Sequence, residues 1–207
     1  MTAPHHPRRV FDLADPDVNG YPLLNALVVP RPIAWVSTVS ADGVGNLAPH
    51  SFFTVACADP AIVQFTSIGA KDTLRNVRDT EELVVNLTPR WLLEHVNGTG
   101  ARFDAGTDEA EALDLVMEPS EKVRPQRVAE SPASLECRLH SIVELGTSAL
   151  VLGEVVAITV WESALEGDHP AIEALQPLSR LGRNEWGLPP EVFAIDRPQR
   201  PEDVRLP

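Results

Sequence analysis

The segment from Ser67 to Thr73 carries the residue types that hold a phosphate group. It predicts a strand that ends, a glycine that frees the backbone and a helix that begins, with Asp72 or Thr73 as the N-cap. The first N–H groups of a helix have no partner inside it, and the helix dipole favours an anion there. Lys71 adds a positive charge, and the hydroxyl groups of Ser67 and Thr73 add donors. Taken alone, the segment is explained more simply by an ordinary capped helix with an exposed lysine.

A second segment could present a flat surface to a heteroaromatic ring. It runs Asn46-Leu-Ala-Pro-His-Ser-Phe-Phe53 and places small Ala48 and Pro49 on a predicted strand, with polar Asn46, His50 and Ser51 around them. A ring could lie against such a backbone and be read by its N–H and C=O groups. Pro49 cannot donate to a ladder, so it predicts an edge, a bulge or a backbone turned toward something other than a strand. Taken alone, a structural bulge with a core histidine explains this segment as well.

Hydrolysis and metal chemistry find little support in the remaining residues. His50 and Ser51 are neighbours on a predicted strand, so their side chains point to opposite faces, and the chain has no G-x-S-x-G elbow. Of the six histidines, His5 and His6 lie in the N-terminal segment and the others are scattered. The sequence has neither H-E-x-x-H nor C-x-x-C. We therefore assign no catalytic residue and no metal ligand.

Residues 43–48 formally match the dinucleotide-binding pattern G-x-G-x-x-A. That pattern needs a helix directly after a strand, because the helix N-terminus receives the pyrophosphate. Here the segment joins two predicted strands in a hairpin, and no helix follows. We reject a Rossmann site, so a nicotinamide cofactor would bind without that motif.

About six strands and three short helices position these segments. The strands are predicted at residues 33–39, 48–58, 61–67, 82–87, 134–145 and 150–161, and the helices at 72–80, after Pro89 and near Asp108. Asp42-Gly43 is typical of a hairpin turn. Residues 119–132 form a predicted surface loop, and a further helix is expected around 170–175. The last strand is apolar on both faces, which predicts deep burial.

The strands follow in hairpin order with helices inserted, rather than in regular strand–helix alternation. This order predicts a mainly β fold, a closed or split antiparallel β-barrel with short helical insertions. We expect the barrel to cover residues 31–185. Residues 1–30 would form an extended N-terminal arm with at most a short turn of helix, and 186–207 a C-terminal extension.

The composition narrows the class of protein. The chain has 207 residues, 43% of them apolar, which suits one globular domain. Its 30 acidic and 17 basic residues give a charge of −13, which argues against nucleic acid and an anionic membrane surface as partners. No apolar run reaches the roughly 20 residues of a membrane span, and the N-terminal segment, which lacks an apolar stretch after its basic residues, is not expected to be a secretory signal. Cys57 and Cys137 are expected to be small buried thiols in a reduced, cytoplasmic protein.

In combination these segments resemble the flavin reductase-like family of FMN-binding split barrels, which includes flavoredoxins. The resemblance rests on Arg31-Pro-Ile-Ala-Trp-Val-Ser-Thr38, Asp42-Gly43, the segment 46–53, Lys71-Asp-Thr-Leu-Arg-Asn76 and Leu83-Val-Val-Asn-Leu87, in that order and at these spacings. It runs from about residue 25 to 185 and includes Ala129-Glu-Ser-Pro132, Leu150-Val-Leu-Gly-Glu-Val155 and Pro177-Leu-Ser-Arg-Leu-Gly182.

The resemblance implies a split barrel that dimerises and binds FMN near the subunit interface, with NADH or NADPH as a transient electron donor. It implies that Trp35, Ser37 and Thr38 line the ring and ribityl side. It further implies that Asn46, Ala48, Pro49, His50 and Ser51 contact the isoalloxazine edge and ribityl hydroxyls, and that Ser67, Lys71, Asp72 and Thr73 hold the phosphate. His50 stands where an aromatic residue or a serine is usual, and Trp186 where a glycine-rich stretch and a tyrosine are expected.

Three functions remain open on this basis. The first is an NAD(P)H-dependent flavin reductase, with a monooxygenase as a candidate partner for the reduced flavin. The second is an electron-transfer protein, or a reductase of a non-flavin acceptor, that holds FMN tightly. The third is a flavin-binding protein without turnover.

Overall fold

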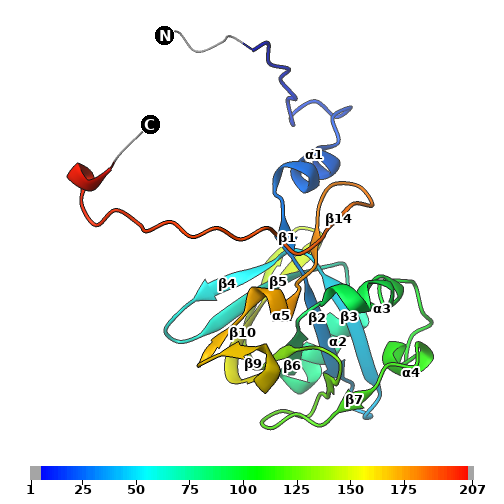
Figure 1. The fold of residues 1–207 in the computed structure, drawn as a ribbon. Helices are drawn as coiled ribbons and strands as arrows, with labels where there is room; N and C mark the ends of the chain where they lie inside the picture. The colour runs from blue at the N-terminus through cyan, green and yellow to red at the C-terminus, as the bar shows by residue number, and fades with distance from the viewer. Residues whose placement is uncertain (1–5, 205–207) are drawn as a thin grey trace.

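Seven strands form the main sheet of the computed structural model, which describes residues 6–204. The order across the sheet is β3–β2–β6–β9–β10–β5–β4, and neighbouring strands all pair antiparallel (Figure 1). The strands are β2 (Ala34–Val39), β3 (Gly45–His50), β4 (Phe53–Cys57), β5 (Ile62–Ile68), β6 (Glu82–Asn86), β9 (Ala133–Leu145) and β10 (Ser148–Val160).

The two edge strands, β3 and β4, follow one another in the chain with only Ser51 and Phe52 between them. The sheet must therefore curl until its two edges meet. The Thr66 N–H of β5 donates to the Phe52 carbonyl at 2.9 Å and ties this junction to the far side of the sheet. The single strand predicted at 48–58 is wrong, because the chain passes from one edge to the other at this point. The split antiparallel β-barrel, with few helices, confirms the predicted fold class.

Successive side chains of β2 point to opposite faces of the sheet and so enter two different cores. Ala34 and Val36 pack inside the barrel with Phe65 of β5. Trp35 points the other way, where it packs with Leu47 under the short helices that follow β6. These helices are η1 (Arg90–Leu92), α3 (Leu93–Gly98) and α4 (Glu109–Ala112). The hairpin of β2 and β3 thus lies between a barrel core and an outer helical layer.

Helix α2 (Asp72–Thr80) packs against the barrel core through Leu74 and Val77, which are 3% and 0% exposed. Its range and its inward residues confirm the prediction. The predicted N-cap is wrong: Lys71 occupies the cap, in extended backbone, and no side chain caps the helix. The helix ends at Glu81, which adopts a left-handed conformation with φ 58°.

The long hairpin of β9 and β10 is less buried than predicted. Ala149 and Val151 are buried, but Ile158 is 64% exposed and Trp161 39%. The reason is that β5 pairs with β10 only over Ser148–Glu154, whereas β9 accompanies it to Val160. Strand β5 therefore covers only the first half of β10. The prediction that residues 150–161 are deeply buried is wrong for the second half.

Several short strands lie outside the main sheet. Strands β7 (Met117–Glu118) and β8 (Arg127–Val128) pair, so the predicted loop 119–132 is partly ordered as a strand. Strands β1 (Arg31–Pro32), β13 (Ser179–Arg180) and β14 (Trp186–Gly187) form a separate three-stranded sheet. The remaining elements are β11 (Leu165–Glu166), β12 (His169–Pro170), η2 (Glu162–Ala164), α5 (Ile172–Leu175) and η3 (Pro201–Asp203).

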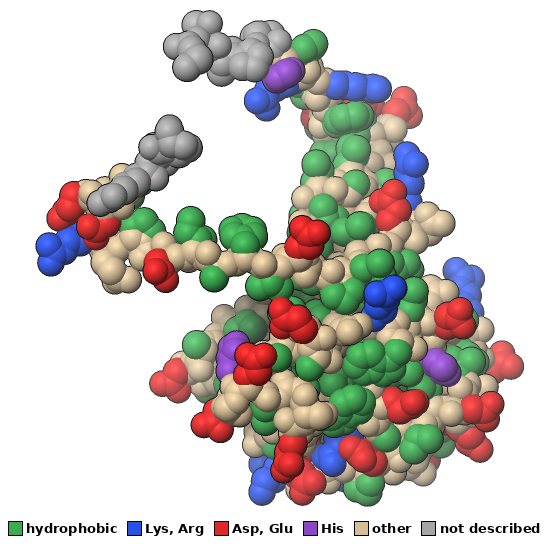
Figure 2. Space-filling model, viewed as in Figure 1, with side chains coloured by type: hydrophobic (Ala, Val, Ile, Leu, Met, Phe, Trp, Pro, Cys, Tyr) green, Lys and Arg blue, Asp and Glu red, His purple; other side chains and the backbone are tan. Residues whose placement is uncertain are grey.

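Both terminal segments extend away from the barrel (Figure 1). The N-terminal one carries α1 (Gly20–Leu27), an eight-residue helix longer than the short turn predicted. Apolar side chains are exposed on both segments, including Leu27 at 77% and Phe193 at 85% (Figure 2 shows the two segments standing off the body). His5, placed by the sequence in this arm, lies outside the described residues.

The two cysteines differ in environment. Cys137 is buried, and burial together with the nearby Glu136 raises the pKa of its thiol to about 12. Cys57 is only partly buried, because it lies on the edge strand β4, so the prediction of a buried thiol is wrong for that residue. Among residues 6–204, no helix has the length and apolar character needed to cross a membrane.

Candidate functional site

A buried polar network joins the β2–β3 hairpin to the first turns of α2. The Asn46 amide on β3 donates to the Thr38 hydroxyl at 3.3 Å and to the Thr73 hydroxyl at 3.1 Å. The Asn76 amide donates to Thr38 at 3.1 Å. All four side chains are buried, and the Asn76 Oδ1 atom has no hydrogen-bond partner in the structure. Since buried polar groups are normally paired, this network holds the hairpin and the helix in one relative position.

His50 extends the network at the end of β3. Its Nε2 atom lies 3.4 Å from the Thr73 hydroxyl, and its ring lies 4.7 Å from the Phe65 ring. Burial lowers the pKa of His50 to about 4; a backbone hydrogen bond at Thr66 opposes this shift, and the Lys71 ammonium adds to it. His50 is therefore a neutral polar side chain at neutral pH.

The N-terminus of α2 is open to an anion. Lys71 stands at the N-cap without a side-chain hydrogen bond to the helix, and its own side chain is exposed. The Asp72 carboxylate is drawn to Arg75, at 2.9 Å, rather than to the helix N–H groups. Gly69, with φ +77°, turns the chain between β5 and the helix. An uncapped helix start beside a lysine favours a negatively charged ligand.

The edge of β3 that faces away from β2 is partly covered by α4. The Leu47 N–H points away from β2 and donates to the Glu109 carboxylate of α4 at 2.8 Å. Burial raises the pKa of Glu109, although this hydrogen bond opposes the shift. Outward-facing groups alternate along an antiparallel edge, so Pro49 also lies on the free side, where its missing N–H costs no ladder bond. The edge location that Pro49 predicted is confirmed.

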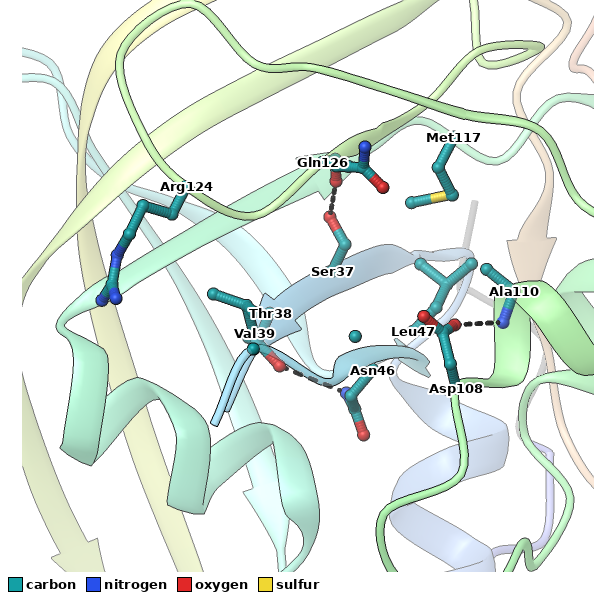
Figure 3. Close-up of a pocket in the computed structure, with 12 residues that line it drawn as sticks. Ser37, Thr38, Val39, Asn46, Leu47, Asp108, Ala110, Met117, Arg124 and Gln126 are labelled. Carbon is teal, nitrogen blue, oxygen red and sulfur yellow. Dashed lines mark hydrogen bonds between the residues drawn. The ribbon is translucent and has the colours of Figure 1, made fainter. Parts of the chain in front are cut away.

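A cavity of about 310 Å³ lies over the hairpin on the side of α4 (Figure 3). Ser37, Thr38 and Asn46 line it together with Asp108, Met117, Arg124 and Gln126. The Ser37 hydroxyl donates to the Gln126 carbonyl at 2.5 Å, and the Asp108 carboxylate accepts from the Ala110 N–H at 2.9 Å. The loop before β8 is thereby held against the hairpin.

A smaller cavity of about 170 Å³ opens beside the other end of β3. Pro49 and Ser51 line it from the strand side, and Trp186 and Arg180 line it from the C-terminal part of the chain. The Arg180 guanidinium lies 4.6 Å from the centre of the Trp186 ring. Sequence reasoning singled out Trp186 but did not assign Arg31 or Arg180, although both stand in segments that carried the family resemblance.

The predicted site residues fall into groups. Thr38, Asn46, His50 and Thr73 lie together in the network, with Lys71 and Asp72 at its helical end. Trp35 lies on the other face of the sheet, fully buried, and its indole N–H donates to Thr99 at 2.9 Å. Ser67 is also fully buried, and its hydroxyl donates to the Gly69 carbonyl at 3.3 Å. Trp35 and Ser67 thus have their side-chain polar groups engaged within the protein.

No cluster of three or more His, Cys, Asp or Glu side chains within residues 6–204 is arranged to hold a metal ion. The site is instead one of amides, hydroxyls, backbone groups and isolated cations. Such donors suit an organic phosphate with a polar head group.

The barrel topology defines the fold class, a split antiparallel β-barrel. The chain belongs to the flavin reductase like domain family, whose model matches residues 26–176. It is similar to nitrilotriacetate monooxygenase component B from Bacillus cereus, with 28% identity and a TM-score of 0.88 over 92% of this chain and 100% of that one.

Two further solved structures are similar. The 2-nitrobenzoate 2-nitroreductase NbaA from Pseudomonas fluorescens is 29% identical, with a TM-score of 0.81 over 86% of this chain and 90% of that one. The flavoredoxin of Desulfovibrio vulgaris shares the fold at 23% identity, with a TM-score of 0.75 over 81% of this chain and 91% of that one. The chain is therefore a flavin-related oxidoreductase of the flavin reductase-like family, which confirms the resemblance in the sequence.

Proposed function

We propose that this protein binds FMN non-covalently and acts as an NAD(P)H-dependent flavin reductase. The observation that carries the proposal is the uncapped N-terminus of α2, which lies beside the free edge of β3. A phosphate on the helix start and a ring on the strand edge match the two ends of FMN. The hydrogen bond from Asn46 to Thr73 would hold the two proposed half-sites in one relative position.

The donor set supports FMN on chemical grounds. Lys71, Asp72, Thr73 and Ser67 would hold the phosphate, with Asp72 acting through its backbone N–H and Ser67 by shaping the turn. Asn46, Ala48, Pro49, His50 and Ser51 would contact the ring edge and ribityl chain. Trp35, Ser37 and Thr38 would form the floor, with Trp35 contributing through packing. Asn76, whose buried Oδ1 atom is unpaired, lines a second cavity of about 310 Å³ together with Asn46 and Asp72, which would place polar groups near the ribityl chain.

Bound FMN would supply the two-electron chemistry, so the protein itself needs to bind and orient rather than to transfer protons. The groups in the site suit that role. His50 is neutral, Thr38 and Thr73 are held by amides, and Glu109 is occupied by the Leu47 N–H. No side chain is therefore named as a general acid or base.

A reductase of a non-flavin acceptor is the second candidate function. It is favoured by the cavity of Arg180 and Trp186, which opens next to Pro49 and Ser51 and so beside the proposed ring position. The nitroreductase among the structural relatives acts on such an acceptor.

We further propose that the protein is a homodimer and that, as a flavin reductase, it supplies reduced flavin to a monooxygenase. The apolar side chains exposed on the outer half of β9–β10 and on both terminal segments support an interface with a second copy. The similarity to a monooxygenase component B supports the second role.

The test begins with the purified protein and its absorption spectrum. Oxidised flavin bands, and anaerobic bleaching of them by NADH or NADPH, are expected. Rapid loss of reduced flavin through a size filter would support the flavin reductase, whereas retained reduced flavin would support the second candidate. A yellow protein that neither donor bleaches would be a binding protein without turnover, and a protein that does not take up FMN would refute all three functions.

A further inference from the structure

Two arginines face each other across a short antiparallel ladder. Arg31 of β1 is the direct register partner of Arg180 of β13. Like charges directly opposite one another destabilise a sheet. The pKa of Arg31 is lowered, first by burial and then by the Arg180 charge. Neither guanidinium forms an ion pair with any carboxylate of the described chain, although the protein carries 30 acidic residues.

The two guanidinium groups differ in how many of their N–H donors are engaged within the protein. Arg31 is 7% exposed and donates to backbone carbonyls, including that of Leu181 at 2.7 Å, while its Nε atom lies 3.5 Å from the Ser51 hydroxyl. It is a structural clamp between the N-terminal segment and the β13–β14 turn. Arg180 is only partly buried and donates to the Arg183 carbonyl at 3.0 Å. A guanidinium has five N–H donors, so Arg180 retains donors for a ligand.

The cavity next to Arg180 has the size of one aromatic ring. Its volume is about 170 Å³, and an apolar cavity of about 150 Å³ holds benzene. Trp186 and Pro49 give it apolar surface, backed by the core residues Ile33 and Val96, and Ser51 and Asn97 add polar groups. Gly100 also lines it, and a Cβ atom there would lie 3.2 Å from the Asn97 carbonyl oxygen and 3.4 Å from the Pro49 ring. The cavity therefore combines a lining of mixed polar and apolar residues with a cation that lacks a carboxylate partner among the described residues.

We propose that this cavity binds a planar aromatic carboxylate. The ring would lie against Trp186 and Pro49, and the carboxylate would face Arg180, with the Ser51 hydroxyl as a second donor. Arginine matches this ligand because its planar fork pairs with both carboxylate oxygens. The bound anion would also neutralise the repulsion between Arg180 and Arg31.

This inference rests on the proposed function, because Pro49 and Ser51 border both the cavity and the proposed ring position. It adds the class of the second substrate, which would bind next to the flavin. A single ring fits the slot, whereas the rest of a dinucleotide would have to lie outside it.

The experiment uses the full-length protein loaded with FMN and two probes, benzoate and the neutral benzamide. Isothermal titration calorimetry gives both dissociation constants, and the flavin spectrum reports whether the probe binds next to the ring. Benzoate should bind and perturb the spectrum. Arg180→Gln should weaken benzoate by at least about ten-fold, equivalent to ~1.4 kcal/mol, and leave benzamide nearly unchanged. Trp186→Leu should weaken both probes.

Arg138→Gln is the matched control, because Arg138 is an exposed arginine on β9 and its loss changes the net charge equally. It should leave both constants unchanged. FMN affinity is measured first for every variant, so a failure of the proposed function is seen before either probe is added. Wild-type binding of FMN without binding of benzoate would overturn the inference alone.

Two other results would overturn it as well. If Arg180→Gln weakens FMN rather than benzoate, the arginine pair holds the flavin phosphate. If it raises the KM for NADH or NADPH and leaves benzoate binding intact, the pair belongs to the phosphates of the dinucleotide. Unfolding midpoints equal to that of the wild type confirm that the variants are folded.

Discussion

The Asn46 amide of β3 donates a hydrogen bond to the Thr73 hydroxyl of α2 across 3.1 Å, although 27 positions separate the two residues. This contact joins the strand edge to the helix N-terminus. It therefore links the proposed ring position to the proposed phosphate position. The same amide also donates to Thr38, so the turn of the hairpin is held by the same residue.

Thr73→Val tests this link with almost no change in shape. The valine removes the acceptor of the Asn46 bond and the partner of His50, while Asn46 keeps its bond to Thr38. We expect a loss of ~1–2 kcal/mol in the free energy of unfolding and a loss of ~1–3 kcal/mol in FMN binding. Urea unfolding of the apoprotein and flavin fluorescence titration measure the two. Thr54→Val, on the exposed part of β4, is the control; unchanged FMN affinity in Thr73→Val would place the phosphate elsewhere.

Lys71→Glu tests the phosphate position by charge. The glutamate would place a negative charge at an uncapped helix start, and we expect FMN to bind more weakly by ~1–3 kcal/mol. Lys122→Glu changes the net charge equally, at an exposed side chain in the loop before β8. Its FMN affinity should equal that of the wild type. Equal weakening in both variants would point to the overall charge instead of a local contact.

Much of the barrel could be predicted from local patterns. Helix α2 and strand β2 have the predicted positions because one segment has helical spacing and the other is β-branched with a hairpin signal. The break at Ser51–Phe52 could not be predicted, because neither Gly, Pro, Asn nor Asp stands there and the strand-forming run Phe53–Cys57 follows at once. Only closure of the sheet, a long-range event, forces the chain to turn there.

The sequence predicted which segments contribute to the candidate site, but not which face of the sheet each side chain occupies. Trp35 and Thr38 lie on one strand, and the pleat sends Trp35 into the outer core and Thr38 into the polar network. The sequence also did not indicate the Arg31–Arg180 pair. The two residues come together only through the pairing of β1 with β13, and no local motif encodes that register.

His50 should make stability depend on pH. Its pKa is about 4 in the folded protein, below the value of about 6.5 expected for the unfolded chain. The unfolded state therefore binds the proton more readily. The contribution of His50 to the free energy of unfolding is complete above pH ~6.5 and is lost as the pH drops toward 4. The fall is at most ~3 kcal/mol.

His50→Phe isolates this effect, because the ring is kept and the titration is removed. Urea unfolding of both proteins between pH 4 and 7 gives the difference in slope, in which the other titrating groups cancel. We expect a shallower pH dependence in the variant. Parallel pH profiles for the two proteins would mean that His50 is not held neutral by burial.

Glu136 should control the loop that covers the cavity of Figure 3. Its carboxylate is fully buried and accepts the N–H groups of Glu121 and Lys122 at 2.8 Å and 2.6 Å, with the Arg127 guanidinium 3.5 Å away. Glu136→Gln keeps the size but removes the charge and one acceptor oxygen. Because hydrogen bonds to a charged group contribute about 1.5–3 kcal/mol, we expect destabilisation within that range and faster amide exchange in residues 119–126.

The exchange measurement separates a local effect from a global one. Hydrogen exchange should accelerate in residues 119–126 and stay unchanged in β5 and β10, which do not contact the loop through this carboxylate. Glu144→Gln on the same strand is the control, since that carboxylate is 66% exposed and pairs only with Arg78. If the loop is also a wall of the flavin site, FMN should protect residues 119–126 in the wild type more than in Glu136→Gln. Uniform acceleration over the whole barrel would instead assign Glu136 to global stability and not to the position of the loop.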